Sequence, residues 1–215
     1  MARPEIRNLE GIVLHAGKGT EGGRSLSVFT REMGLFRFSV SLPTMKRYGT
    51  GVMLPLSCIR FSASLQADYG RMSQYEGRLL LEMMKLTYEE MNSWYYVIEL
   101  VLSLFPMGER DLRAYTLLQK AAMAARSRNP RVCAFVAAVQ LLAAAGYDPA
   151  EEEPAGELGL SEKGRELLSL FRNYSWEEPF GASIPAALFR ECARYLDRFI
   201  FSYCDVHLKT EGAFL

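Results

Sequence analysis

Six basic side chains in the first third of the chain are the residues best suited to binding another molecule. They are Arg24, Arg37, Lys46, Arg47, Arg60 and Arg71. Cations of this kind neutralise phosphates, and each neutralised phosphate releases counterions from a nucleic acid. Tyr48 and Phe38 are candidate rings on which bases could stack. Any one such cation is more often an ordinary solvated residue, and a ring such as Phe38 is more often part of the core, so only the segment as a whole favours binding to nucleic acid.

The net charge of zero for the 215 residues hides an uneven distribution along the chain. Residues 1–75 hold ten Lys or Arg and five Asp or Glu, which gives a net charge of +5. Residues 76–215 hold the other 15 basic and 20 acidic residues, which gives −5. This division predicts an N-terminal part that faces a polyanion and a C-terminal part that faces other proteins.

The basic part has the residue pattern of short β-strands separated by turns. Alternating apolar and polar residues, bounded by Gly and Pro, predict strands at about 11–16, 25–30, 35–41, 52–65 and 69–74. We expect the residues at 41–47 to form a weakly basic loop between the third and fourth strands. Phe36, Phe38 and Val40 fall on one face of the third strand and Arg37 on the other. Five strands fit a barrel of the OB type best.

From about Glu76 the pattern is helical, with start signals at regular intervals. Thr87 and Glu90 form a capping box, Asp111 and Asn129 can cap the next two helices, and Ser161 can cap another. A long last helix is expected to follow Pro185. The prediction is an α+β fold of two domains, an OB-like barrel at 1–75 and a helical domain at 76–215 with an acidic loop at 148–160.

Residues that could support catalysis or bind a metal ion form no recognisable pattern. No Ser, Asp or Cys stands in a catalytic frame with His15 or His207, and the segment at 17–20 lacks the spacing of a phosphate-binding loop. None of the four cysteines lies within four positions of another, whereas zinc sites use closely spaced pairs. We predict no enzyme, no metal and no cofactor.

The sequence also predicts a cytoplasmic protein that does not contact a membrane. The longest apolar run, Val97–Phe105, is far shorter than the roughly 18 residues of a membrane span, and it contains Glu99. No apolar segment follows Arg3, as it would in a secretory signal.

Three stretches, in one order along nearly the whole chain, are similar to motifs of a known family. The first is Gly11–Leu14 followed by Glu21-Gly22 and Leu26–Gly34, the second is Leu141–Pro149, and the third is Arg194–Leu196 followed by His207–Thr210 and Phe214-Leu215. They resemble the opening hairpin, the "LLxxxGYxP" signature and the C-terminal ending of RecO, a bacterial recombination mediator with an N-terminal OB-fold and a helical C-terminal domain.

The resemblance implies a non-enzymatic DNA repair and recombination protein. Such a mediator binds single- and double-stranded DNA, promotes annealing and helps to load the recombinase RecA. The implied partners are a RecR-like recombination protein and the C-terminal tail of single-strand-binding protein.

Two differences from the family qualify these implications. Many family members carry a zinc-binding cysteine cluster after the "GYxP" stretch, whereas Glu151–Leu160 contains no cysteine. The family's loop between the third and fourth strands is strongly basic, whereas residues 41–47 contain only Lys46 and Arg47. We therefore expect no zinc and a lower affinity for nucleic acid than is usual in the family.

The alternative is a protein-interaction adaptor whose OB domain has lost most of its DNA binding. The neutral total charge and the weakly basic 41–47 segment favour it. A salt titration of oligonucleotide binding separates the two functions, because a mediator's affinity falls steeply with salt while an adaptor does not bind even at low salt. An enzyme is the least favoured alternative.

Overall fold

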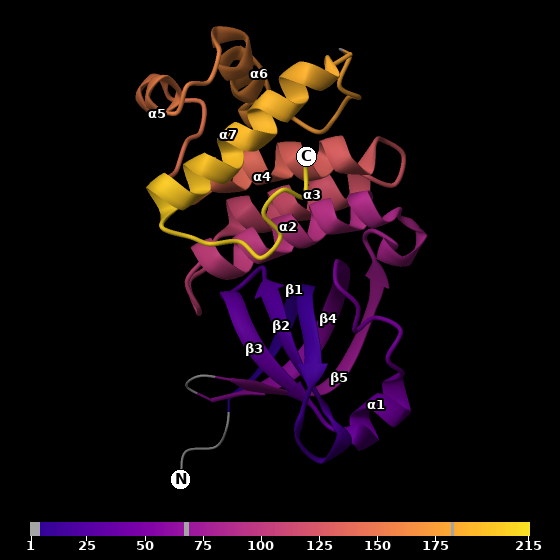
Figure 1. Cartoon of the computed structure of the whole chain (residues 1–215). Helices are drawn as coiled ribbons and strands as arrows, with labels where there is room; N and C mark the ends of the chain where they lie inside the picture. Colours follow the sequence, from indigo (N-terminus) through magenta and orange to yellow (C-terminus); the bar gives the residue numbers. More distant parts are fainter. Residues whose placement is uncertain (1–4, 67–68, 182) are drawn as a thin grey trace. The chain divides into compact units, whose positions relative to one another are not determined.

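The computed structural model describes residues 5–66, 69–181 and 183–215, which form two compact units (Figure 1). The first unit holds the described residues up to Met83 together with Phe105–Gln119. The second holds Met84–Leu104 and Lys120–Leu215. The division differs from the predicted single boundary between residues 75 and 76, because a segment from the helical part of the sequence belongs with the strands.

Five strands form a closed barrel in the first unit. They are β1 (Glu5–Lys18), β2 (Arg24–Thr30), β3 (Gly34–Val40), β4 (Ser57–Leu65) and β5 (Gly70–Leu79), in the hydrogen-bonded order β1-β2-β3-β5-β4. Strand β1 pairs antiparallel with both β2 and β4, and β3 pairs in parallel with β5. The predicted α+β layout, strands first and helices after, is confirmed.

The barrel core follows from the two-residue period of the strands, which sends alternate side chains inward. Phe36, Phe38 and Val40 of β3 are buried in it and Arg37 is exposed, as the alternation predicts. Phe38 and Phe61 meet edge to face with ring centroids 4.8 Å apart. Because Phe38 is buried, its ring is not accessible for stacking with a base, and this prediction was wrong.

The predicted boundaries of three elements were wrong. The fourth strand, expected at 52–65, begins at Ser57, and Leu56 before it has a φ of +60°, which is incompatible with an extended strand. The segment expected as a loop at 41–47 is helix α1 (Leu42–Tyr48). Ser41 caps α1 by accepting the N–H of Thr44, and Pro43 lies in its first turn, where a missing N–H costs nothing. The fifth strand continues to Leu79 instead of giving way to helix at Glu76, because pairing with β4 along its whole length overrides local propensity.

The segment that follows Phe105 completes the first unit. Met107 bridges to Leu35 on β3, and the N–H of Gly108 donates to the Leu35 carbonyl at 2.8 Å. The rings of Phe105 and Tyr115 pack on Phe29 at centroid distances of 5.4 and 6.5 Å. These contacts explain why residues 105–119 belong with the barrel.

Helices in both units begin at the predicted caps. Thr87 and Glu90 exchange the two capping-box hydrogen bonds ahead of α2 (Tyr88–Leu104). Asp111 accepts the N–H of Ala114 at the start of α3 (Leu112–Ala124), a helix whose residues from Lys120 belong to the second unit. Asn129 caps α4 (Pro130–Ala144). Ser161 caps α6 (Glu162–Arg172), and α7 (Ala186–Cys204) follows Pro185.

Helix α4 is the centre of the second unit. Every residue from Cys133 to Leu142 is buried, and α4 contacts both α2 and α6, while α6 contacts α7. The predicted acidic loop at 148–160 contains a short helix, α5 (Glu152–Glu157), whose Pro154 and Ala155 are buried. Within the described residues, no helix combines the length and the apolar character needed to cross a membrane.

The last residues of the chain are fixed in the core of the second unit. Phe214 is 2% exposed, and its ring lies 4.9 Å from that of Tyr96 and 5.0 Å from that of Phe135. Glu99 accepts hydrogen bonds from the backbone N–H groups of Lys209 and Thr210. The tail is therefore a structural element of this unit.

We expect Gly34→Ala to destabilise the first unit by about 2 kcal/mol or more. Gly34 has a φ of +69°, and an added Cβ would lie 1.7 Å from the Glu109 carbonyl oxygen, so backbone would have to move. Thermal unfolding measures the loss. Gly51→Ala, which meets nothing within 4 Å, is the matched control. Equal stability of the two variants would contradict the assigned contact.

We expect Phe214→Ala to lower the free energy of unfolding of the second unit by about 3–5 kcal/mol, because it leaves a cavity among packed rings. Chemical denaturation followed by far-ultraviolet circular dichroism measures the change. Leu215→Ala, whose side chain is 54% exposed, serves as the control and should change little. A large loss with Leu215→Ala and none with Phe214→Ala would overturn this placement of the tail.

Candidate nucleic-acid interface

Arg37 and Arg71 lie on the same outer surface of the barrel. The register places Ser27 opposite Arg37, and it places Ser39 opposite both Ser25 and Arg71. His15 lies opposite Ser27 on the neighbouring strand β1. We call the surface formed by these six residues the β2–β3–β5 face: His15, Ser25, Ser27, Arg37, Ser39 and Arg71.

The β2–β3–β5 face has the chemistry of a phosphate-binding surface. Arg37 and Arg71 are exposed, and in the described part of the chain neither is paired with an acidic side chain. Ser39 lies next to both arginines, and Ser25 and Ser27 lie beside them on β2. Arg and Ser are among the side chains that contact phosphate oxygens in nucleic-acid complexes. The outward positions of β2 and β3 include no acidic residue.

Arg24 extends the positive charge to the end of the β1–β2 hairpin. Arg24 lies opposite Lys18 in the register of β1 and β2, where both strands end at the hairpin, and both side chains are exposed. The loop between them is closely packed, since a Cβ on Gly23 would lie 2.6 Å from the Val40 carbonyl oxygen. Lys18 and His15 were absent from the predicted set, although their position on β1 beside β2 could have indicated them.

Lys46 and Arg47 form a separate group in the last turn of α1. The Arg47 guanidinium carbon lies 5.3 Å from the centroid of the Tyr48 ring, and Tyr48 in turn lies 5.5 Å from Tyr75. Among the described residues, no hydrogen bond or ring contact joins this group to Arg37 or Arg71. Tyr48 is 37% exposed, so its ring is accessible for stacking.

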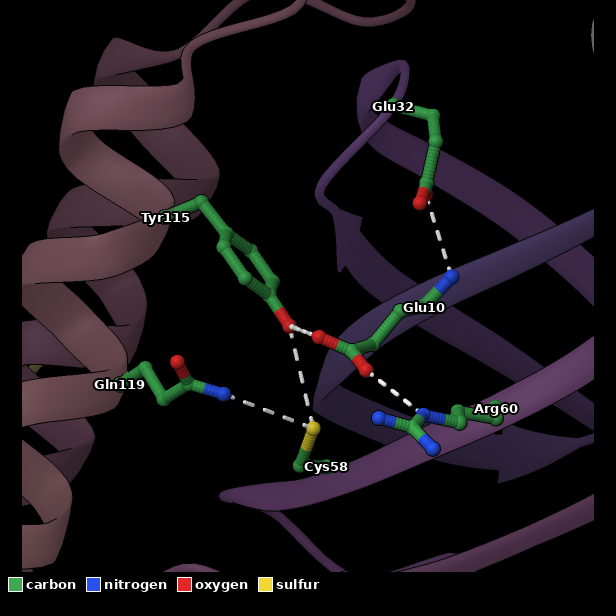
Figure 2. A network of polar contacts seen from close by, with 6 residues as sticks. All are labelled: Glu10, Glu32, Cys58, Arg60, Tyr115 and Gln119. Carbon is green, nitrogen blue, oxygen red and sulfur yellow. Dashed lines mark hydrogen bonds and ion pairs between the residues drawn. The ribbon is translucent and has the colours of Figure 1, made fainter.

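Arg60 is held in an ion pair instead of lying free. Its Nε donates to Glu10 Oε2 at 2.8 Å (Figure 2). Glu76 lies opposite Arg60 on β5. The N–H of Glu10 donates to Glu32 Oε2 at 3.1 Å. A phosphate would have to displace Glu10 and approach two further carboxylates to reach this guanidinium. Arg60 therefore differs from Arg37 and Arg71 in its electrostatic surroundings.

The Glu10 carboxylate also fastens the start of α3 to the barrel. Tyr115 donates its hydroxyl to Glu10 Oε1 at 3.1 Å, and Cys58 lies 3.8 Å from both this hydroxyl and the Gln119 amide nitrogen (Figure 2). The hydrogen bond from Arg60 is the main cause that lowers the pKa of Glu10. Burial raises the pKa of the Cys58 thiol and of Tyr115, so both stay protonated at neutral pH.

An open groove of about 620 Å³ runs along the side of the barrel that carries Glu10 and Arg60. Its floor includes a hydrogen-bonded row in which Ser62 donates to Asn8 at 2.5 Å and Gln74 donates to Ser62 at 3.0 Å. Three carboxylates and two guanidinium groups line it: those of Glu10, Glu32, Glu76, Arg31 and Arg60. This mixture is less favourable to phosphates than the β2–β3–β5 face.

Other chemistry-bearing residues remain dispersed within the described residues. Cys58, Cys133, Cys192 and Cys204 are free thiols. No group of three or more His, Cys, Asp or Glu side chains is placed to hold a metal ion in residues 5–66, 69–181 and 183–215. The geometry that remains is that of a surface for binding, with cations and hydroxyl groups presented by rigid strands.

No family model matches this chain, and no curated protein matches it significantly. The function must therefore be argued from the residues and their arrangement.

We expect Glu10→Gln to destabilise the first unit at neutral pH by about 1–3 kcal/mol, since it weakens hydrogen bonds to a charged acceptor. The folded pKa of Glu10 lies below its ordinary value near 4.3, so its stabilisation is present above that value. The stabilisation disappears as pH falls through the lowered folded pKa, and the difference between wild type and variant should shrink accordingly. Unfolding free energies measured at pH 7 and at about pH 3 test this.

Glu5→Gln is the control, because Glu5 makes a comparable pair with Arg7 on the exposed surface. Such exposed pairs contribute little to stability. A destabilisation by Glu10→Gln that did not change with pH would assign the effect to packing instead of charge.

Proposed function

We propose that the first unit is an OB-fold that binds nucleic acid on its β2–β3–β5 face. The proposal draws on the strand order β1-β2-β3-β5-β4, in which β4 returns beside β1 as in a five-stranded Greek-key barrel. OB-folds bind oligonucleotides on the face of strands 2 and 3 and with the loops beside it. Arg37 lies on that face, Arg71 lies next to it, and Arg24 begins β2.

The observation that carries the proposal is the position of Arg37 and Arg71. The two exposed guanidinium groups lie beside Ser25, Ser27 and Ser39, no acidic residue points outward from β2 or β3, and the paired strands fix these positions relative to one another. A protein surface that contacts the phosphates of a nucleic acid instead of its base edges can bind many nucleotide sequences.

The role that fits such a surface is that of a non-enzymatic DNA repair and recombination mediator. Binding both single- and double-stranded DNA, such a protein lowers the repulsion between phosphates and so promotes annealing. The resemblance to RecO extends this role to helping recombinase loading together with a RecR-like protein. We propose that the protein acts in the cytoplasm, the default compartment for a sequence in which we find no export signal.

A groove in the second unit is our candidate for the tail of single-strand-binding protein. It has a volume of about 650 Å³ and is lined by the start of α4, by residues 174–180 and by Ile184. Val132, Val136, Trp176 and Phe180 make it largely apolar. Arg128 also lines it, and its guanidinium donates to the Tyr174 hydroxyl and the Trp176 carbonyl. Every C-terminal tail carries a carboxylate, which Arg128 could bind while the groove holds an apolar side chain.

The adaptor function is the second candidate, and the ion pair of Arg60 with Glu10 favours it. One of the six predicted cations is neutralised, and two others lie on α1. If those on the β2–β3–β5 face do not suffice for binding, the apolar groove of the second unit would be the main interaction surface.

Binding of fluorescent single-stranded oligonucleotide, measured by anisotropy across a salt series, tests these alternatives. We expect Arg37→Ala/Arg71→Ala to weaken binding about tenfold or more and to flatten the salt dependence by about one to two phosphate contacts. The reason is that both guanidinium groups lie on the proposed contact face.

Lys46→Ala/Arg47→Ala removes the same charge from α1 and is the matched comparison. We expect this variant to weaken oligonucleotide binding less than Arg37→Ala/Arg71→Ala does. A flatter salt dependence with the α1 variant, and none with the Arg37 and Arg71 variant, would move the interface to α1. If the wild-type protein does not bind even at low salt, the adaptor function is supported and the mediator function fails.

A further inference from the structure

The solvent face of α7 carries a row of three arginines. Arg190, Arg194 and Arg198 are exposed and follow one another at four-residue spacing, so they lie on one side of the helix about 6 Å apart along its axis. With Ala187 and Glu191 they surround a shallow hollow of about 490 Å³. The net charge of −5 over residues 76–215 gives no indication of this row.

An exposed aromatic ring lies on the same side of α7. Phe201 follows Arg198 by three residues, and the four side chains fall within an arc of about 80° around the helix. The Phe201 side chain is 54% exposed, and the ring of His207 lies against it at a centroid distance of 4.6 Å. We call the surface formed by Arg190, Arg194, Arg198 and Phe201 the α7 face.

The α7 face is fixed outward because the opposite side of the helix is held by the core. Cys192, Tyr195, Leu196 and Phe199 are buried, and the Tyr195 hydroxyl donates to the Pro149 carbonyl at 2.9 Å. Rotating the arginines toward a partner within the unit would expose these side chains to water. The cations are therefore available to a partner outside the chain.

Two acids of α7, Glu191 and Asp197, lie beside the α7 face, and both carboxylates accept hydrogen bonds from within the second unit. Among the described residues, none of the three arginines forms an ion pair, and the Arg198 guanidinium donates to the Arg194 carbonyl on its own helix. The neighbouring Glu191 accepts the N–H of Ser161 at 2.8 Å and so serves the cap of α6. Like charges four residues apart destabilise a helix, so a row of three is expected where an anion compensates them.

We propose that the α7 face is a second binding surface for single-stranded nucleic acid, separate from the β2–β3–β5 face. Arginines bind phosphate in a bidentate manner, and an exposed ring offers a base a stacking surface. A convex helix face suits a flexible strand. This inference rests on the proposed function and deepens it, because a protein that anneals DNA must hold two strands.

The test uses the full chain and counts bound strands. We expect the wild type to bind two short oligo-dT molecules, and Arg190→Gln/Arg194→Gln/Arg198→Gln to bind one. The same variant should anneal complementary oligonucleotides, followed by fluorescence energy transfer, at least tenfold more slowly. Phe201→Ala should weaken the second site about fivefold or more.

The matched control is Lys120→Gln/Arg126→Gln/Lys163→Gln, which removes three exposed charges of the second unit elsewhere. If the control and the α7 variant behave alike while the wild type binds DNA, the α7 face is overturned and the proposed function stands. If the wild type binds no oligonucleotide, the proposed function fails as well. If the α7 variant loses binding of poly-glutamate but keeps both strands, the face serves an acidic protein and the inference is wrong.

Photocrosslinking tests the inference on the wild-type protein, so it does not require the triple variant to fold. Oligonucleotides containing a photoreactive uracil should crosslink to the tryptic peptide 199–209, which contains Phe201 and His207. Crosslinks confined to peptides of the first unit would overturn the inference.

Discussion

The pairing of β1 with both β2 and β4 is the constraint on which the barrel and its surfaces depend. With the pairing of β3 and β5, it closes the sheet into a barrel. Because side chains alternate along a strand, each strand residue of a closed barrel points either into the core or outward. The same register that buries Val28 and Phe38 presents Ser27 and Arg37 to solvent. A shift of one residue would exchange these roles, so the interface and the core are specified by the same hydrogen bonds.

Closure also separates the charges of the first unit into two environments. On the side of Glu10 and Arg60, cations and carboxylates neutralise one another over a polar groove. On the side of Arg37 and Arg71, the neighbouring outward residues are serines, and the positive charge is left uncompensated. A net charge of +5 over residues 1–75 therefore understates how strongly one side of the barrel differs from the other.

Local signals in the sequence predicted most of the elements. The caps at Thr87, Asp111 and Asn129 act through side chains within three residues of the backbone they satisfy, so the sequence displays them. Helix α1 was missed although Ser41, Pro43 and Gly49 carry equivalent signals.

Contacts between distant segments could not be predicted in this way. Glu10 and Arg60 lie 50 residues apart, and Leu35 meets Met107 only because β3 leaves an edge that residues 105–111 cover. The ion pair with Glu10 makes Arg60 a weaker candidate for phosphate binding than the sequence alone indicates. The contact between Leu35 and Met107 helps to place residues 105–119 in the first unit. Both depend on the closed topology, which counting strands cannot establish.

The balance of charge over the whole chain is compatible with the function that we propose. Two small cationic surfaces on a molecule of zero net charge give an attraction that acts at short range, because screening limits it to about 10 Å at moderate salt. If the protein anneals DNA as we propose, it can hold a strand by a few phosphates and lose it when pairing with a complementary strand offers a better compensation. A uniformly basic protein would instead retain both strands. Zero net charge over the whole chain and positive charge on part of its surface therefore do not contradict one another under the proposed function.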